Sequence, residues 1–600
     1  MDWVLFFILS SACLVLSIIL AVVREKSKYR SGRFFDPLTI LFIGVIVSAV
    51  LLFLPVYFYT FKENACGIFE TIVISIHNVI RLFIVDGDFQ FVTEHIAGLS
   101  GWISRAYSIL FSILFVFAPL LTFGFALSFL KNLSAYFSYK THFGSDVYIF
   151  SELNEKSLTL ARDLYENEPK KRFFVFTDVF DNGEEQSFEL IEGAKEIGAI
   201  CFKRDIVVVD FSFHSKKCSM NFFLIGEDQS ENIEQGLKLI DRYKYREHAN
   251  MYVFSTEMES EVLLARAFDE SGNVKIKVRR INEVQSLVTR TLYEEGYEKI
   301  FKSAYEDQNG VKNINAIVVG LGQHGREMTK ALSWFCQMSG YQVRIHAFDI
   351  DKKAEEKFVS LCPELMDLKL NGNFDIEGEA QYQIMVHSGM DIDTRKFDDM
   401  IMDLPRTTYI FVALGKDGKN ISTAMKLRSL LLRKGHEPVI HAVVYNSSKK
   451  QTLSGITNFK NQEYKIDFIG DRKTAYSEKV ILHSDVEEAA LKRHMKWGEE
   501  KAFWQYDYNY KSSMASAIHR KMKALCQIPG IEKKPEERTE EELWAIRILE
   551  HRRWNAYMRS EGYVYGGTVE RSGRNDMAKM HNCLVPFKQL PYEEQIKDDD

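Results

Sequence analysis

Residues 315–325 read NAIVVGLGQHG, an apolar run followed by three closely spaced glycines. Glycines at a strand-to-helix turn let the backbone approach a pyrophosphate, and the helix N-terminus that follows attracts negative charge. Two acids follow the next predicted strand, somewhat later than the usual spacing of about 20 residues, and their carboxylates can accept hydrogen bonds from a ribose. The candidate nucleotide-binding residues are Gly320, Gly322, Gln323, His324, Gly325, Asp349 and Asp351.

This turn predicts NAD(H) or another nucleotide as the ligand. The competing interpretation is that the glycines only permit close packing of the strand against the helix. A dehydrogenase would also need an acid–base residue beside the turn, and His324 is the one obvious candidate. We find no nucleophile–base pattern in the sequence.

A second group of residues whose side chains could bind a ligand lies in 543–566, LWAIRILEHRRWNAYMRSEGYVYG. On a helix, His551, Asn555 and Arg559 share one face, and Trp554 lines the adjacent one. Aromatic planes beside guanidinium and amide donors suit a base and a phosphate. The alternative is that the aromatic residues are core and the arginines form a solvated face. The candidate pocket residues are His551, Arg552, Trp554, Asn555, Arg559, Tyr563 and Tyr565.

Three apolar runs near the start of the chain are long enough to cross a bilayer, which takes about 20 helical residues. Basic residues follow the first run, whereas in a signal peptide the charges precede the apolar core. The positive-inside rule keeps those basic residues in the cytosol and places the N-terminus outside. The predicted spans are 3–23, 38–59 and 106–130.

A fourth apolar stretch, residues 68–85, contains three ionisable residues. If it crossed the membrane, the large soluble region would lie outside, against the charge rule. We therefore expect a re-entrant helix, an element that is tolerated inside protein or around water. Asp86 and Asp88 follow, and their carboxylates at a pore mouth would concentrate cations. The alternative is an extracellular amphipathic helix with a solvated acidic turn.

Composition argues against other functional classes. The 600-residue chain has a formal net charge of −6, which gives no indication of nucleic-acid binding. Its eight cysteines are scattered, with no CxxC pair and no Cys/His cluster at metal-ligand spacing. We therefore expect reduced thiols in a cytosolic body and no metal site.

From residue 146 onward, apolar strands alternate with helical stretches, the pattern of a parallel doubly wound sheet. The series occurs twice, because residues 222–239 align with 410–427 and match Asn232 to Asn420. The first copy reads YIFSELNEKS where the second has its glycines, so we expect it to be a scaffold or to bind something else. The predicted strands are 147–150, 173–176, 206–209, 222–225, 251–254 and 274–278 in the first copy, and 316–319, 343–348, 383–387, 409–413, 440–444 and 466–469 in the second.

A membrane segment followed by two such units resembles the regulator-of-potassium-conductance (RCK) family, and the resemblance covers residues 145–480. It implies cytosolic units that assemble as a ring beneath a tetrameric pore, where ligand binding pulls on the last span. The chain departs from potassium channels because residues 60–105 contain no TVGYG-like filter. A cation channel is expected, without an indication of potassium selectivity.

Residues 500–597 resemble the RyR domain, which is named after the ryanodine receptor and also occurs in bacterial proteins. The resemblance implies a nucleotide-sensing module, of a kind associated with bacterial immune or conflict systems. The short acidic tail departs from the closing helix that the family leads us to expect. The matching residues are Glu550, His551, Trp554, Gly562, Tyr563, Tyr565, Gly566 and His581, the last leading to LVPF.

The sequence therefore predicts a pore region (1–135), two α/β doubly wound Rossmann-like domains (145–300 and 312–485) and a mainly α-helical RyR-like domain (490–600). We expect a ligand-gated ion channel, a homotetramer in the cell (inner) membrane with cytoplasmic soluble domains and a nucleotide-type ligand. The RyR resemblance adds a role in antiviral defence. The alternatives are a membrane-anchored NAD-dependent oxidoreductase and a non-conducting, membrane-tethered nucleotide sensor.

Overall fold

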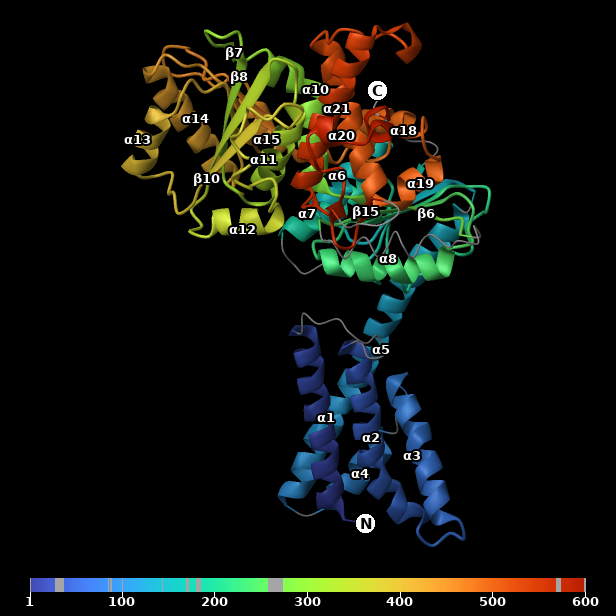
Figure 1. Cartoon of the computed structure of the whole chain (residues 1–600). Coiled ribbons are helices and arrows are strands. Elements are labelled where there is room, and N and C mark those ends of the chain that lie inside the picture. Colours follow the sequence, from blue (N-terminus) through green and yellow to red (C-terminus); the bar gives the residue numbers. More distant parts are fainter. Residues whose placement is uncertain are drawn as a thin grey trace. The chain divides into compact units, whose positions relative to one another are not determined.

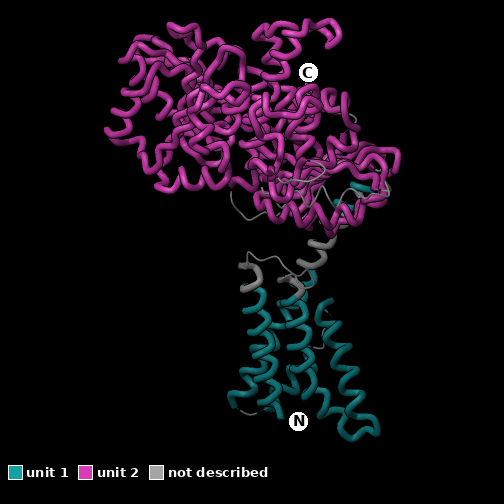
Figure 2. Tube along the Cα trace, in the orientation of Figure 1, with its two compact units in different colours: residues 1–141 teal, residues 142–600 magenta. Residues whose placement is uncertain are grey.

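The computed structural model divides the chain into two compact units, Met1–Thr141 and His142–Asp600 (Figure 2). Each unit is described by itself below. The structure describes residues 2–26, 37–84, 86, 89–99, 101–142, 144–168, 172–179, 185–256, 274–567 and 573–597.

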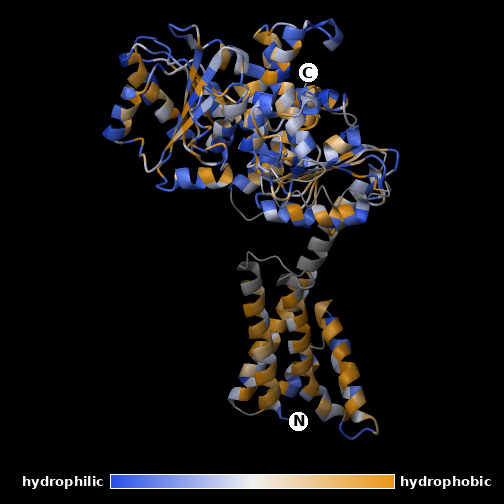
Figure 3. Ribbon diagram, viewed as in Figure 1, coloured by the Kyte–Doolittle hydropathy of each residue, from blue (hydrophilic) through white to orange (hydrophobic). Residues whose placement is uncertain are grey.

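The described residues of the first unit form helices joined by short turns, and the unit is strongly apolar (Figures 1 and 3). Three of its helices contain stretches that are long and apolar enough to cross a membrane, at Trp3–Val22, Ile40–Phe61 and Trp102–Phe123. These stretches confirm the three predicted apolar helices. The helices are α1 (Trp3–Lys26), α2 (Pro37–Phe61), α3 (Gly67–Phe83), α4 (Phe89–Ala97) and α5 (Trp102–Thr141).

The segment between α2 and α5 leaves and returns at the same end of this unit. The Phe83 ring at the end of α3 lies 4.8 Å from the Phe42 ring near the start of α2, so α3 runs back along α2. The hydroxyl of Ser104, at the start of α5, donates to the carbonyl of Ile96 at the end of α4. The ring of Trp3 contacts both Tyr59 and Tyr107, so the end of α2 and the start of α5 are neighbours.

The second unit begins with a six-stranded parallel sheet in the order β3-β2-β1-β4-β5-β6. Its strands are β1 (Asp146–Phe150), β2 (Arg172–Phe176), β3 (Ile200–Cys201), β4 (Met220–Leu224), β5 (Ala249–Phe254) and β6 (Lys277–Ile281). The helices α6 (Glu155–Asn167), α7 (Glu185–Glu196), α8 (Gln229–Tyr243) and α10 (Glu283–Gly296) connect or follow these strands. The order is that of a doubly wound fold, as the sequence predicts.

Two predicted strands of this sheet need correction. Residues 206–209 form a turn rather than a strand, because Asp205 accepts from the Val207 N–H through its side chain and from the Val208 N–H through its carbonyl. The third strand is Ile200–Cys201, and the last strand begins at Lys277 rather than at residue 274. Ile206 and Val209 in the turn are buried, which explains why the segment resembles a strand in sequence.

The second sheet has the parallel order β10-β9-β8-β11-β12-β13, and β7 pairs antiparallel with the start of β8. All six predicted strands of this copy are confirmed. They are β8 (Lys312–Val319), β9 (Tyr341–Phe348), β10 (Tyr382–His387), β11 (Tyr409–Val412), β12 (Val439–Val443) and β13 (Ile466–Ile469), with β7 at Tyr305–Glu306. The main helices are α11 (Gln323–Phe335), α12 (Ala354–Leu361), α13 (Arg395–Asp403), α14 (Asp417–Arg433) and α15 (Ser447–Leu453).

The two asparagines that the sequence repeat pairs have the same structural role. Asn232 accepts from the Gly226 N–H and donates to the Phe254 carbonyl, which ties the end of β4 to the end of β5. Asn420 accepts from the Leu414 N–H and donates to the Val443 carbonyl, and so ties β11 to β12. The repeat therefore extends from sequence to side-chain hydrogen bonding.

The C-terminal part is mainly helical, as expected, and shares its core with the second sheet. Apolar residues of α20 and α21 belong to the same buried cluster as one face of β8 and β9. The elements are α16 (Arg472–Ala475), α17 (Glu478–Ile481), α18 (Asp485–His494), α19 (Glu500–Gln505), α20 (Asp507–Leu525), α21 (Glu540–Ser560) and α22 (Tyr592–Gln595), with a small sheet of β14 (Val564–Tyr565), β16 (Met580–His581) and β15 (Arg574–Asn575).

Candidate functional site

The three glycines of the β8–α11 turn have different roles. Gly320 has a φ of +91°, and a Cβ there would lie 2.4 Å from the Ala413 carbonyl oxygen. A Cβ on Gly325 would lie 1.7 Å from the Gly320 carbonyl oxygen. A Cβ on Gly322, by contrast, would meet nothing within 4 Å. Packing therefore requires two of the glycines, whereas Gly322 keeps the turn open on its outer side.

The N-terminus of α11 carries no side-chain cap. Gly322 is the N-cap residue, and both Gly322 and Gln323 are exposed. A helix leaves its first-turn N–H groups without intrahelical partners, and these groups with the helix dipole favour an anion. The turn therefore has the geometry that a phosphate requires.

The two predicted acids lie beside this turn. The Asp349 carboxylate accepts from the Leu321 N–H at 2.6 Å and from the Asp351 N–H at 2.8 Å, so it is part of the turn. Asp351 pairs with Lys357 at 2.5 Å, and this hydrogen bond lowers the pKa of the Asp351 carboxyl. The structure thus brings the glycines and Asp349 together, with Asp351 half-exposed next to them.

The open turn faces the first sheet. The Gln323 amide donates to the Thr256 hydroxyl, which follows β5, at 3.4 Å. Arg472, which follows β13, pairs with Glu155 at the start of α6. His324 lies 3.5 Å from the Tyr445 hydroxyl, and burial lowers the pKa of its imidazole. The carboxyl ends of the two sheets therefore meet, and residues of both surround the turn.

The equivalent turn of the first copy is closed by its own side chains. The Ser151 hydroxyl accepts from the Ile225 N–H, and the Glu152 carboxylate accepts from the Glu227 N–H at 3.1 Å. Asn154 and Ser157 form a reciprocal capping box at the start of α6. The Ser157 N–H in the first turn of α6 is thus engaged by the Asn154 cap, and the Glu152 and Ser151 side chains occupy the space beside the turn with bonds to the segment after β4.

The predicted pocket face of α21 packs against the second sheet. His551 and Asn555 both donate to the Val585 carbonyl, at 2.8 and 3.0 Å. Arg559 forms a bidentate pair with Glu379, at 2.7 and 3.1 Å, and both residues are 1% exposed. His551, Asn555 and Arg559 thus do share a face, but His551 bonds within the module, and Asn555 and Arg559 bond to Glu379 in the loop before β10.

Other predicted residues of this module are more accessible. Trp554 is half-buried, and its ring lies 4.8 Å from that of His581. The Nε of Arg552 is buried without a hydrogen-bond partner, and burial lowers the pKa of the guanidinium to about 10. The Tyr563 hydroxyl donates to Asp576 at 2.7 Å, whereas Tyr565 is 51% exposed. Arg552, Trp554 and the exposed Tyr565 are therefore the predicted residues best able to contact a ligand here.

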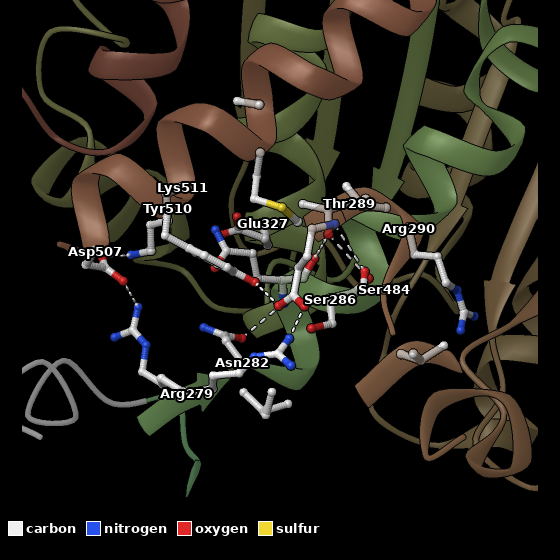
Figure 4. A pocket seen from close by; sticks show the side chains of 18 of the residues that line it. Arg279, Asn282, Ser286, Thr289, Arg290, Glu327, Ser484, Asp507, Tyr510 and Lys511 are labelled. Atoms are coloured by element: carbon white, nitrogen blue, oxygen red, sulfur yellow. Dashed lines mark hydrogen bonds and ion pairs between the residues drawn. The ribbon is translucent and has the colours of Figure 1, made fainter. Parts of the chain in front are cut away.

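A cavity of about 80 Å³ lies where both sheets meet the C-terminal helices (Figure 4). Side chains of α10, including Asn282 and Ser286, line one side, and Tyr510 and Lys511 of α20 line another. Pockets for drug-sized ligands occupy roughly 300–1,000 Å³. This cavity has the size for a few waters or a small polar ligand rather than for a nucleotide.

A continuous chain of ion pairs crosses this junction. It consists of Arg280 with Asp507, Asp507 with Lys511 (2.7 Å), Lys511 with Glu561 (3.7 Å), Glu561 with Lys330 (3.1 Å) and Lys330 with Glu327 (3.3 Å). Burial disfavours the charged Glu561 carboxylate, but the two adjacent lysines outweigh it and lower its pKa to about 2. Lys330 and Glu327 are on α11, and Arg280 is on β6. This series of ion pairs therefore joins α11, the helix that follows the glycine turn, to the first sheet.

Sequence reasoning missed these paired residues because their partners lie far apart along the chain. Lys330 and Glu561 are separated by 231 positions, and Arg280 and Asp507 by 227. No periodicity or motif in either segment indicates such a contact. Only the charged composition of α20 and α21 could have suggested ion pairing.

The predicted pore residue Asp86 forms an ion pair with Arg81 at 3.3 Å, and its side chain is 74% exposed. Asp88 lies outside the described residues. Among the residues that the structure describes, no group of three or more His, Cys, Asp or Glu side chains is placed to hold a metal ion.

Comparison with known proteins finds no family model that matches this chain and no curated protein that matches it significantly. The RCK and RyR resemblances therefore stay predictions from the sequence.

Proposed function

We propose that this protein is a membrane ion channel gated by a nucleotide-type ligand that binds at the β8–α11 turn. One observation carries the proposal: the second copy leaves the N-terminus of α11 uncapped beside two acids, whereas the first copy closes its own turn. The same chain has three helices that are able to span a membrane, so the proposed sensor at the β8–α11 turn and a membrane segment are parts of one protein.

The course of the segment from α3 to α4 supports a pore, in which this segment would be the re-entrant element that the sequence predicts. It begins and ends at one end of the unit, and Asp86 lies near its turning point. The side of α3 that packs on its neighbours carries the small polar residues Thr71, Ser75 and Asn78. Its exposed side carries Ile68, Phe69, Ile72, Val73, Ile76 and Ile80, which suits lipid or other copies of the pore.

Transmission would follow the ion pairs of the junction. A ligand at the turn contacts the start of α11, and Lys330 on this helix is linked through Glu561, Lys511 and Asp507 to Arg280 on β6. If the ligand prefers one arrangement of these elements, it shifts the population of open pores by that difference in affinity. Arg552 and Trp554 offer a second contact for the same ligand class.

We propose a homo-oligomer, a tetramer by the RCK resemblance, in the inner membrane with its second unit in the cytoplasm. The RyR resemblance extends the proposal to antiphage defence, in which a nucleotide signal made during infection would open the pore and depolarise the cell.

The decisive experiment is recording from the purified full-length protein in planar bilayers with a panel of NAD(H), ATP and cyclic oligonucleotides. We expect a conductance that depends on one ligand and is lost in Gly322→Asp, which places a carboxylate where the phosphate would bind. Asn154→Gly, at the cap of the first copy, is the matched control and should conduct like the native chain.

Two results would overturn the proposal. Binding of a panel member without any ligand-dependent conductance would identify a non-conducting tethered sensor. Turnover of NAD(H) by the purified protein would identify a membrane-anchored oxidoreductase.

A further inference from the structure

Helix α13 presents an unusual arrangement of charge on the surface of the second sheet. It packs through the fully buried side chains of Phe397 and Ile401, while Lys396 and Asp403 are exposed. Arg395 and Asp399, also exposed, pair with each other at 3.5 Å on the same helix. The outer face is therefore basic at its start and acidic at its end.

The charges of α13 follow the helix dipole at one end only. A helix favours acids in its first turn and bases in its last, because its ends carry partial positive and negative charge. In α13 the first turn contains Asp398, but the last turn contains no base and ends with Asp403. The exposed Lys396 and Asp403 lie two helical turns apart on one face, so a partner with opposite charges can meet both of them.

A shallow groove runs along the same helix, with a volume of about 610 Å³. Its apolar lining residues are Met400, Leu404 and Pro405, and His387 of β10 also lines it. β10 is the terminal strand of its sheet, so the groove lies at a sheet edge. An apolar strip between a basic end and an acidic end has the composition of an interface core with a charged rim.

We propose that α13 and this groove bind a second copy of the chain, with the two α13 helices antiparallel across a two-fold axis. The midpoint between Lys396 and Asp403 falls beside Met400, so an axis there places Lys396 of each copy opposite Asp403 of the other. The same axis brings the two Met400 side chains together. A two-fold contact needs a surface that is complementary to itself, and an antiparallel arrangement of this helix meets that requirement.

The interface does not depend on channel activity, because it uses neither the glycine turn nor the membrane unit. It specifies one surface through which copies would assemble. Since its charged pairs lie at the rim, they set the register and partner choice more than the total affinity, and added salt weakens them.

The test uses the full-length chain carrying Met400→Cys, with a short bis-maleimide crosslinker and a denaturing gel as the readout. The chain without Met400→Cys gives the background from the native cysteines. We expect a crosslinked dimer in the Met400→Cys chain. Adding Lys396→Glu should reduce its yield at least tenfold, because it places acids opposite Asp403, and Asp403→Lys alone should do the same by placing bases opposite Lys396.

Charge exchange distinguishes a second copy from any other partner. The double variant Lys396→Glu/Asp403→Lys, or a mixture of the two single variants with different tags, should restore crosslinking to within about threefold of Met400→Cys alone, because opposite charges again face each other. Absence of a dimer band in Met400→Cys, equal yields in all variants, or failure of both exchanges to restore the yield would each overturn the proposal.

Discussion

The β1–α6 and β8–α11 turns occupy the same place in two copies of one fold, and they differ in how their backbone donors are used. In the first copy, Asn154 caps α6 and Ser157 returns a hydrogen bond to the cap. In the second copy, glycines stand at the cap and at the third helical position, Gly322 and Gly325. The first turn has its own side-chain cap, whereas the second has none, so its capping N–H remains for a ligand.

This difference shows that a repeat can keep its scaffold and change its binding capacity at a few positions. Asn232 and Asn420 join neighbouring strands in the same way in both copies. Gln229 and Asp417, three residues before these asparagines, likewise accept from the N–H groups that follow β5 and β12. The scaffold is therefore shared, and the turn is where the copies diverge.

The largest expected effect comes from placing a serine at Gly325, the third helical position of α11, which Ser157 occupies in the first copy. Gly325→Ser places a Cβ within 2 Å of the Gly320 carbonyl oxygen, a clash that backbone movement must relieve. We expect destabilisation of roughly 3 kcal/mol, at the upper end for overpacking, measured as a drop in the thermal midpoint of the purified protein. Ser157→Gly in the first copy should cost only about 1 kcal/mol, because it removes the hydrogen bonds that the Ser157 hydroxyl makes with the Asn154 backbone and causes no clash. Equal losses would show that the two turns are not packed differently.

The paired asparagines should behave alike. Asn232→Ala and Asn420→Ala each leave a partly buried N–H and a buried strand-end carbonyl without their side-chain partner, and the expected cost is about 1–3 kcal/mol. Hydrogen exchange should speed up in β4 and β5 for the first variant and in β11 and β12 for the second. If only one variant showed faster exchange, the shared scaffold would be disproved.

Capping the open turn should separate stability from binding. Gly322→Asp fits, since a Cβ there meets no neighbour and the backbone is extended, so the carboxylate can cap α11 and stabilise it by about 0.5 kcal/mol. The same carboxylate should weaken nucleotide binding at least tenfold, or about 1.4 kcal/mol, in isothermal titration. Unchanged affinity together with higher stability would mean that this turn is not the ligand site.

The smallest expected effect is a dependence of ligand affinity on pH. Burial lowers the pKa of His324, so its imidazole is neutral at pH 7, and a bound phosphate would favour its protonated form. Affinity should therefore rise a few-fold as the pH falls from about 7.5 to about 5.5. His324→Gln should remove this dependence. The same slope in both proteins would assign the titration to another group.

Much of the fold follows from the sequence, because strand and helix periodicity depend on local burial. All six strands of the second sheet lie where alternation with helices predicts them. The failure at 206–209 has a local cause, since Asp205 bonds to the backbone of the next residues and holds an apolar segment in a turn. Periodicity alone does not distinguish a buried turn from a short strand.

The candidate sites also contain a part that the sequence predicts and a part that it does not. Spacing is enough to identify the glycine turn and its acids, because these residues are close in sequence or end adjacent strands. The role of the α21 face was not predictable, because Glu379 lies 176 positions from Asn555 and meets Arg559 only after the sheet and the helix pack. A helical face can be recognised from sequence, but its partner cannot.

The sequence by itself determined the three apolar helices, the two parallel sheets, their repeat and the glycine turn, because each depends on the local spacing of apolar residues and glycines. Only the tertiary structure decided that, of the three turn glycines, Gly322 is the one free of packing, that Arg559 is held by Glu379, and that ion pairs link α11 to β6. The physical reason is that packing space and charge pairing depend on where distant segments meet. The local spacing of residues does not indicate which distant segments come into contact.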